Sequence, residues 1–164
     1  MIDVLREGKS VMVGNMASIV AGAFVLAVAA GAAFAGDVNQ DAGVAVKGYD
    51  PVAYFVDHKP VKGSPAYTAE FGGVTYEFAS KAHRDAFSAD PAKYVPQYGG
   101  FCAFAMAKGH KADIDPAAFS IVANKLYLNH SEKVRDMWQQ DIPDFVTQAD
   151  NNWSSVAQQP DDAR

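Results

Sequence analysis

The side chains best suited to chemistry in this 164-residue sequence lie in one short segment, residues 98–110. Cys102, Met106 and His110 follow one another at intervals of four residues, so in a helix they would lie roughly along one face. Thiolate, thioether and imidazole are soft or borderline donors, which suit Cu(I) better than Mg²⁺ or Ca²⁺. The segment therefore suggests a copper-type site. In the alternative interpretation Met106 fills the core, and Gly109 ends the helix and leaves His110 in a solvated loop.

Cys102 is the only cysteine of the chain, so it cannot form a disulfide within it. The thiol can ligate a metal, cycle as a redox group, pair with a partner protein, or act as a small buried hydrophobe. Gly99 and Gly100 precede it and permit backbone angles that other residues avoid. If a helix begins at Phe101 or Cys102, its dipole lowers the thiol pKa, which favours a working thiol.

His83 is a further candidate ligand, because it lies one turn before Phe87 on a predicted helix and would be partly covered. An ordinary hydrogen-bond partner would explain it equally well. His58 and His130 lie beside turns without a spacing partner, so we expect both at the surface. The sequence contains no phosphate loop, nucleophile elbow, His-Glu-x-x-His pair or Cys-x-x-Cys pair. It also lacks a complete set of catalytic residues, so it does not predict an enzyme.

The N-terminal residues 1–35 have the order of a secretory signal peptide. Arg6 and Lys9 come first, and no charged residue follows from Ser10 through Gly36. Small residues at Ala33 and Ala35 predict cleavage after Ala35 and a periplasmic or secreted protein. A retained membrane anchor is the alternative, because the uncharged run is long enough to cross a bilayer of about 30 Å.

The rest of the chain predicts one domain, residues 36–157, followed by a polar tail, residues 158–164. The chain has a net charge of −5 and no concentrated basic face, which argues against nucleic acid as a partner. We expect contact with a membrane only if the N-terminal segment is retained.

The pattern of the domain predicts an α+β fold, a small single domain of antiparallel hairpins packed by short helices. Strict alternation around Gly72-Gly73 predicts a hairpin over residues 67–78, and Ser80 caps a helix that ends near Ala89. Three Asp-Pro pairs predict short helical turns at 52–56, 92–95 and 117–119. A second hairpin is expected over 119–128. Ser131 is expected to cap a helical region that Pro143 divides in two.

The chain resembles the exported YHS-domain proteins over nearly all of this domain. The resemblance is carried by Val46 to Phe55, Tyr76 to Ser80, Arg84 to Phe87, Asp90 to Tyr94 and Gln97 to Ala103, and it continues through Lys125 to Asn129. The wider family is similar to TRASH-type modules that accompany copper-transporting ATPases, so the resemblance implies metal handling and a metal-handling or redox partner.

Two features of this sequence qualify what the resemblance implies. The wider family often carries two cysteines where this chain has Ala79 and His83, so that thiolate pair cannot operate here. The exported branch includes members with selenocysteine, and its expected position matches Cys102, which implies soft-metal or redox chemistry there. Three hypotheses follow: a soft-metal module using Cys102 with His83, Met106 or His110; a thiol redox protein; and a structural interaction domain.

Overall fold

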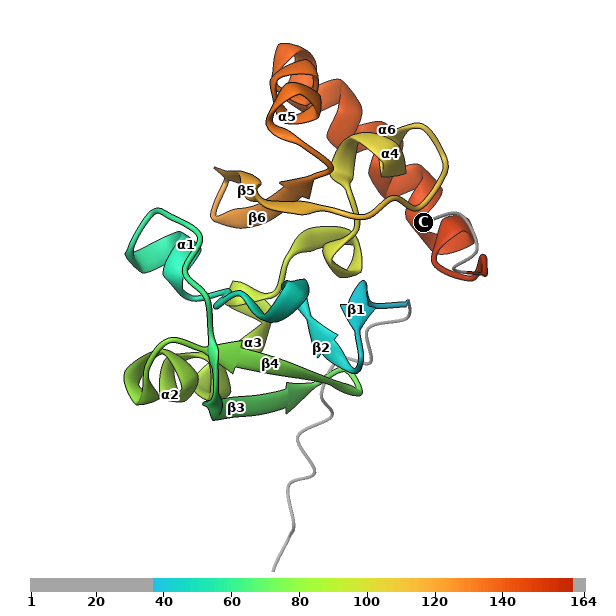
Figure 1. Ribbon diagram of the computed structural model, residues 1–164. Helices are drawn as coiled ribbons and strands as arrows, with labels where there is room; N and C mark the ends of the chain where they lie inside the picture. The colour runs from blue at the N-terminus through green and yellow to red at the C-terminus, as the bar shows by residue number, and fades with distance from the viewer. Residues whose placement is uncertain (1–36, 161–164) are drawn as a thin grey trace, which may run out of the picture. The chain divides into compact units, whose positions relative to one another are not determined.

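The computed structural model describes residues 37–160, so the predicted signal peptide lies outside the described residues. Helices and short strands alternate along this range (Figure 1), which confirms the α+β prediction. The elements, with η for 3-10 turns, are β1 (Gln40–Asp41), β2 (Val44–Ala45), η1 (Val46–Gly48), α1 (Ala53–Val56), β3 (Ser64–Phe71), β4 (Val74–Phe78), α2 (Lys81–Ala89), α3 (Pro91–Tyr94), η2 (Gln97–Gly100), α4 (Ala103–Ala107), β5 (Asp115–Val122), β6 (Lys125–Asn129), α5 (Glu132–Trp138), η3 (Gln139–Asp141) and α6 (Ile142–Val156). In the range 37–160, no helix combines the length and the hydropathy that a membrane span needs.

The first sheet has the strand order β1-β2-β4-β3. Its centre is the predicted hairpin, in which β3 and β4 pair antiparallel and Phe71 lies opposite Val74 across the Gly72-Gly73 turn. Alternate residues of β4 are buried, as period-two patterning predicts. The N-terminal strands were not predicted, because two residues are too short to show a period; β2 joins β4 in parallel through Val44 and Thr75.

The helix starts follow the expected capping chemistry in most places. Ser80 accepts the backbone N–H of His83, and Ser131 accepts that of Val134, so both predicted serine caps are confirmed. Asp50-Pro51 and Asp90-Pro91 precede α1 and α3 as predicted, and Asp50 accepts the backbone N–H of Val52, but Asp90 makes no side-chain cap hydrogen bond.

The prediction of a helical turn at 117–119 is wrong, because these residues belong to strand β5. Asp115 does accept the backbone N–H of Ala117 at 2.9 Å, as a residue that starts a turn would. The chain then extends and pairs with β6, with a register shift between Asp115 and Phe119. An Asp-Pro pair can thus open a strand as well as a helix, since the side chain satisfies a local N–H in both cases.

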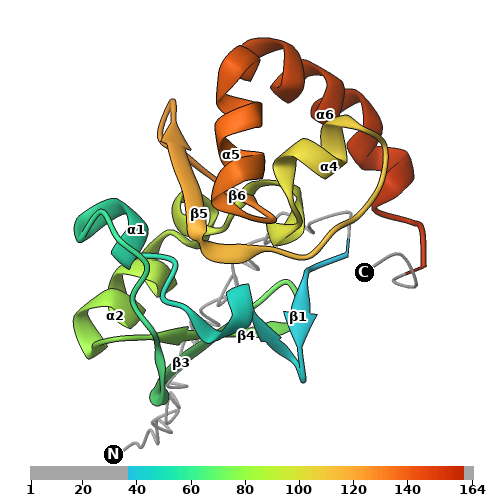
Figure 2. The same ribbon diagram turned by 45° about the horizontal axis from the view of Figure 1, so that its top comes forward.

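The second sheet is the predicted hairpin of β5 and β6, which α4, α5 and α6 accompany. Both ribbon views place these helices beside the hairpin, while α2 lies against the first sheet (Figures 1 and 2); α3 contacts α2 and β6. Pro143 lies in the first turn of α6, so it separates the two C-terminal helices as predicted.

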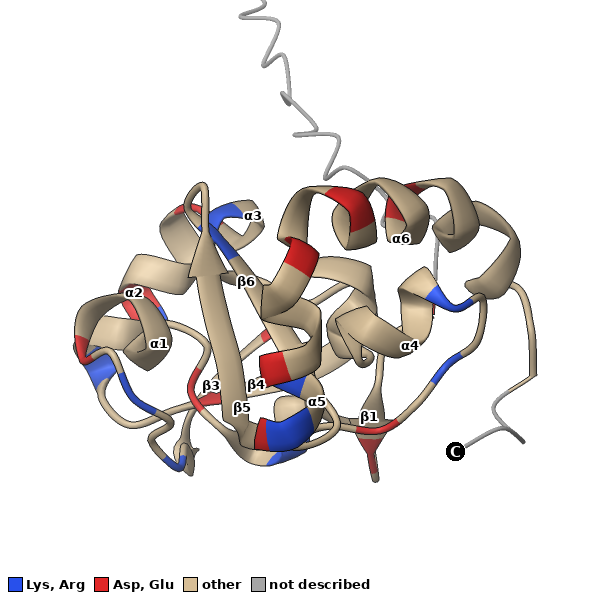
Figure 3. Ribbon diagram, turned by 90° about the horizontal axis from the view of Figure 1, so that it is seen from above, with Lys and Arg blue, Asp and Glu red and all other residues tan. Residues whose placement is uncertain are grey.

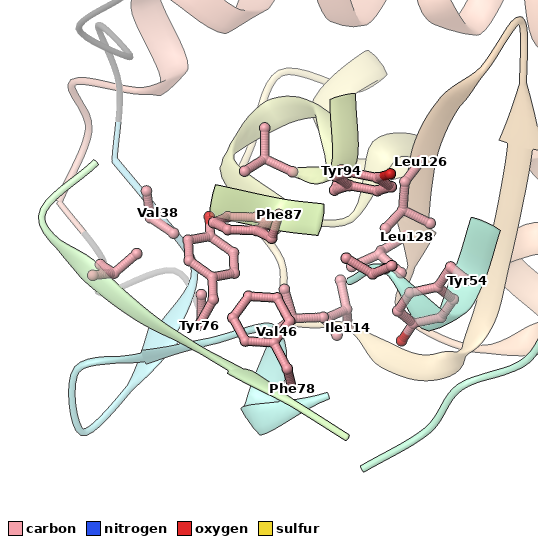
Figure 4. Packing of buried hydrophobic residues seen from close by; sticks show 14 of the residues in the cluster. Val38, Val46, Tyr54, Tyr76, Phe78, Phe87, Tyr94, Ile114, Leu126 and Leu128 are labelled. Carbon is pink, nitrogen blue, oxygen red and sulfur yellow. The ribbon is translucent and has the colours of Figure 1, made fainter. Parts of the chain in front are cut away.

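Two hydrophobic clusters hold the elements together. In the first, Phe87 of α2 packs on Tyr76 and Phe78 of β4, with ring centroids 4.9 and 5.0 Å apart (Figure 4). Leu126 and Leu128 of β6 belong to the same cluster, so it joins the first sheet to the second hairpin. The second cluster lies under α6 and contains residues of η2, α4, β6 and α5 together with Ala149 and Val156 of α6 itself.

The η2 turn packs against the first residues of the described range, Asp37 to Asn39. Tyr98, Gly99 and Gly100 all have positive φ, and the backbone N–H of Asn39 donates to the carbonyl of Gly99 at 2.9 Å. A Cβ on Gly99 would lie only 2.1 Å from the carbonyl oxygen of Asp37, so this position requires glycine.

A buried lysine joins the two ends of the described chain. Lys111 is 1% exposed, and its ammonium donates to Asp37 at 3.1 Å and to the carbonyl of Gln159 at 2.6 Å. The ammonium also lies 5.2 Å from the ring centroid of Phe101. Because a buried charge must be paired, these contacts hold both ends beside one side chain.

Replacing Gly99 with alanine should destabilise the fold strongly. The Gly72→Ala variant is the matched control, because Gly72 has a similar φ of +63° but nothing within 4 Å of its added Cβ. Backbone strain alone should lower the free energy of unfolding of the control by about 1–2 kcal/mol. The clash with the backbone should lower that of Gly99→Ala by at least about 1 kcal/mol more than this. Urea unfolding measures both values, and equal losses would contradict the proposed steric role.

Candidate functional site

The candidate site is built around Cys102, at the beginning of α4. Cys102 is the N-cap residue of that five-residue helix, as the conditional prediction required. Its backbone N–H donates to the carbonyl of Ala112 at 3.0 Å, and the residue forms a parallel bridge with Leu128 of β6. The thiol is therefore placed by contacts with two distant segments as well as by the helix.

The sulfur lies in a nearly closed environment, since Cys102 is 1% exposed. The backbone N–H of His130 donates to Sγ at 3.3 Å, and the thiol donates to Oδ1 of Asn129 at 3.7 Å. The same Oδ1 accepts the backbone N–H of Phe104 at 3.2 Å. The buried Nδ2 of this amide has no hydrogen-bond partner among the described residues.

Burial raises the pKa of the Cys102 thiol above its ordinary value, although the backbone N–H groups of Ala105, His130 and Phe104 oppose this rise. The expectation of a lowered pKa at the helix N-terminus is therefore wrong. The dipole of a five-residue helix is weak, and loss of water around the sulfur outweighs it.

A hollow of about 260 Å³ borders Cys102. Its walls are mainly apolar. It is lined by Cys102, Phe104, Ala105, Lys108, His110, Ala112, His130 and Val134. The hollow is thus bordered by two histidines, one lysine and a cysteine that is almost fully buried.

His130 is the residue that sequence reasoning missed. It is exposed, as expected, yet it lines the hollow beside Cys102. Its Nδ1 lies 3.1 Å from the carbonyl oxygen of Asp113; because a carbonyl can only accept, Nδ1 is the donor in this hydrogen bond. The pairing of Cys102 with β6 that brings His130 here leaves no local signal in the sequence.

The structure brings Cys102 and His110 to the same hollow, but it places Met106 elsewhere. Met106 is fully buried in the second cluster with Phe101 and Trp138, which matches the interpretation of Met106 as core filler. Gly109 has a φ of +84° and follows the end of α4, so His110 leaves the helical line as the alternative anticipated.

His83 belongs to a different polar centre, formed around the buried Asp50. Nδ1 of His83 lies 2.7 Å from Oδ2 of Asp50, which also accepts the backbone N–H of Ala79 at 2.8 Å. Oδ1 of Asp50 accepts the N–H groups of Val52 at 2.8 Å and Ala53 at 3.2 Å. His83 therefore has the ordinary hydrogen-bond partner that the sequence left open, and it does not line the hollow.

Across residues 37–160, no group of three or more His, Cys, Asp or Glu side chains is arranged to hold a metal ion. A preformed site with three such ligands is therefore absent from this part of the chain.

Residues 52–98 match the family model of the YHS domain, so the chain contains a YHS domain over this segment. No curated protein and no solved structure matches the chain. The matched segment includes His83. It ends four residues before Cys102, so the hollow lies in the part of the chain that follows.

The Cys102 thiol should titrate above the value of an ordinary cysteine. We expect its alkylation by iodoacetamide to be slow near neutral pH and to accelerate through a midpoint above that of an ordinary cysteine, because burial disfavours the thiolate. The urea-unfolded protein is the control and should show the ordinary midpoint. A native midpoint at or below that of the control would contradict this account.

Replacing Asp50 with asparagine should lower the free energy of unfolding by about 2–4 kcal/mol, because the amide cannot accept every N–H that the buried carboxylate now accepts. Asp85→Asn is the control, since Asp85 is half exposed and pairs at the surface with Lys81. Its loss of stability should be much smaller, because exposed ion pairs contribute little. Urea denaturation of both variants measures the difference, and similar losses would contradict the central role of Asp50.

Proposed function

We propose that this YHS-domain protein binds a soft metal ion of the Cu(I) type in the hollow beside Cys102. The thiolate of Cys102 is the principal ligand, and His110 or His130 supplies an imidazole nitrogen. The observation that carries the proposal is that the only cysteine of the chain, although buried, borders the same hollow as two histidines.

The donor set supports a soft cation. Thiolate and imidazole select Cu(I) and related metals, whereas Mg²⁺ and Ca²⁺ require oxygen ligands, and neither Asp nor Glu lines the hollow. The hydrogen bond from Nδ1 of His130 to the carbonyl of Asp113 orients this ring, as is usual for ligating histidines. Of the predicted ligands, the proposal keeps Cys102 and His110 and adds His130.

The raised pKa of the thiol favours this function over thiol redox catalysis. A redox thiol needs a substantial thiolate fraction near neutral pH, and burial reduces that fraction in Cys102. A metal ion instead displaces the proton, so its affinity rises with pH while the thiol remains protonated.

The metal is best regarded as cargo. A site with one thiolate and one or two imidazoles releases an ion more readily than a site with several thiolates, which suits passage to or from a metal-handling partner. If the secretory pattern of residues 1–35 operates, this exchange takes place in the periplasm or outside the cell.

Anaerobic titration of the protein with Cu(I) against a chromogenic chelator tests the proposal. We expect one ion per chain, an affinity that rises between about pH 6 and pH 8 because a thiol proton is displaced, and loss of binding in Cys102→Ser. His110→Gln and His130→Gln should each weaken binding or, if one imidazole replaces the other, only the double variant should.

Two control variants separate ligands from bystanders. His58→Gln removes an exposed imidazole that does not line the hollow, and Met106→Leu removes the buried thioether while keeping the core volume. Both should bind Cu(I) as the wild type does. Binding that survives Cys102→Ser, or absence of stoichiometric metal in the wild type, would overturn the proposal.

A further inference from the structure

A second hollow lies between α1, α3 and the tip of the β5–β6 hairpin. Its volume is about 290 Å³. It is lined by Phe55, Val56, His58, Lys93, Tyr94, Ile121 and Asn124, and it shares no residue with the hollow beside Cys102. A dry apolar cavity of about 150 Å³ can hold benzene, so this hollow has room for one phenyl ring and a short chain attached to it.

Contacts between aromatic rings hold the walls of this second hollow in place. The ring centroids of Phe55 and Tyr94 lie 5.5 Å apart in edge-to-face geometry, which fixes α1 against α3. Tyr54 of α1 packs on Phe119 of β5 with centroids 4.9 Å apart, and α3 contacts β6. Because such contacts stabilise the packing of all three elements, the hollow is formed before a ligand arrives.

The apolar wall of the second hollow is open to solvent. Val56 is 57% exposed; within residues 37–160 it and Met137 are the exposed large hydrophobic residues. Phe55 and Ile121 on the same wall are only half-buried. A ligand whose carbon atoms cover these three side chains therefore gains free energy by removing apolar surface from water.

The polar residues of the second hollow favour an anion. Lys93, His58 and Asn124 line it, and neither Asp nor Glu does. Among residues 37–160 the Lys93 ammonium makes no ion pair, and it lies 5.0 Å from the ring centroid of Tyr94. Figure 3 shows this basic position on α3. In a chain of net charge −5, a hollow with a free ammonium and no carboxylate is a local site for negative charge.

We propose that this second hollow binds a small apolar carboxylate, a molecule whose carbon body is about the size of one phenyl ring. The body packs on Phe55, Val56 and Ile121, and the carboxylate pairs with the ammonium of Lys93. The amide of Asn124 supplies a further N–H donor for the carboxylate. Small-molecule sites usually have this composition, in which apolar walls supply most of the contact and a few polar groups fix the orientation.

Titration of the ¹⁵N-labelled protein with 3-phenylpropanoate, followed by amide chemical shifts, tests the inference. We expect saturable changes that fit one site and concentrate at residues 55–58, 93–94 and 121–124. The neutral 3-phenylpropanamide has the same shape and should bind about two- to fivefold more weakly, the effect of one partly exposed ion pair. Acetate carries the charge without the carbon body, so it should cause no saturable change.

Variants of Lys93 assign the preference for the carboxylate to its charge. Lys93→Gln should bind 3-phenylpropanoate and 3-phenylpropanamide equally, whereas Lys93→Arg should keep the preference. Lys133→Gln removes an exposed lysine of α5 that does not line the second hollow, so it should behave as the wild type does.

A substitution at Val56 tests the apolar wall. Val56→Glu places a carboxylate beside the ligand and should weaken 3-phenylpropanoate more than the amide, because like charges repel. Met137→Glu is the matched control, since Met137 is the other exposed large hydrophobic residue and does not line the second hollow. Both positions are exposed, so both variants should fold, and their amide spectra show whether they do.

Three results would overturn the inference: changes that do not saturate, changes that concentrate elsewhere, and equal binding of the acid and the amide by the wild type. It also fails if a peptide ending in phenylalanine binds while 3-phenylpropanoate does not, because the second hollow would then receive a protein C-terminus. None of its lining residues borders Cys102, so failure here leaves the proposed metal site to its own titration.

Discussion

The position of the thiol depends on one close backbone contact, between the turn at Gly99 and the first residues of the domain. Gly99 approaches the carbonyl of Asp37 too closely for any side chain, and Asn39 bonds the carbonyls of Gly99 and Gly100 through its backbone and its amide. The chain therefore leaves the turn toward β6, where Cys102 forms its bridge with Leu128. A helix of five residues would not fix the sulfur alone; three segments that are distant in the sequence do so together.

The domain has two polar centres, one around Asp50 and one around Cys102. Asp50 gathers Val52, Ala53, Ala79 and His83, so a single carboxylate joins α1, the end of β4 and the start of α2. The backbone N–H of Ala79 and Nδ1 of His83 both form hydrogen bonds with this carboxylate. The Asp50 centre therefore has a structural role within the matched YHS segment.

Local patterns predicted the parts of the fold that local interactions determine. The β3–β4 hairpin followed from period-two alternation around two glycines, and α2 and α5 followed from their serine caps. The Asp115-Pro116 pair led to a wrong prediction of a helical turn, because the side chain of Asp115 accepts the same local hydrogen bond at the start of a strand. His130 and the raised pKa of Cys102 could not be foreseen, since both arise from the meeting of α4 with β6, whose residues lie 26 to 28 positions apart. Spacing along one helix suggested Met106 as a ligand, but its side chain packs into the other cluster.

The ammonium of Lys111 makes the two ends of the domain interdependent. Asp37 and the carbonyl of Gln159 share this buried cation, and Asp37 also supplies the carbonyl against which Gly99 packs. Removing either end would thus leave the buried ammonium of Lys111 without one of its two partners. Removing Asp37 would also loosen the turn that leads to the thiol. A tether, tag or cleavage near residue 37 would therefore also disturb the contact that Lys111 makes with residue 159. The residues at both borders are part of the folded domain.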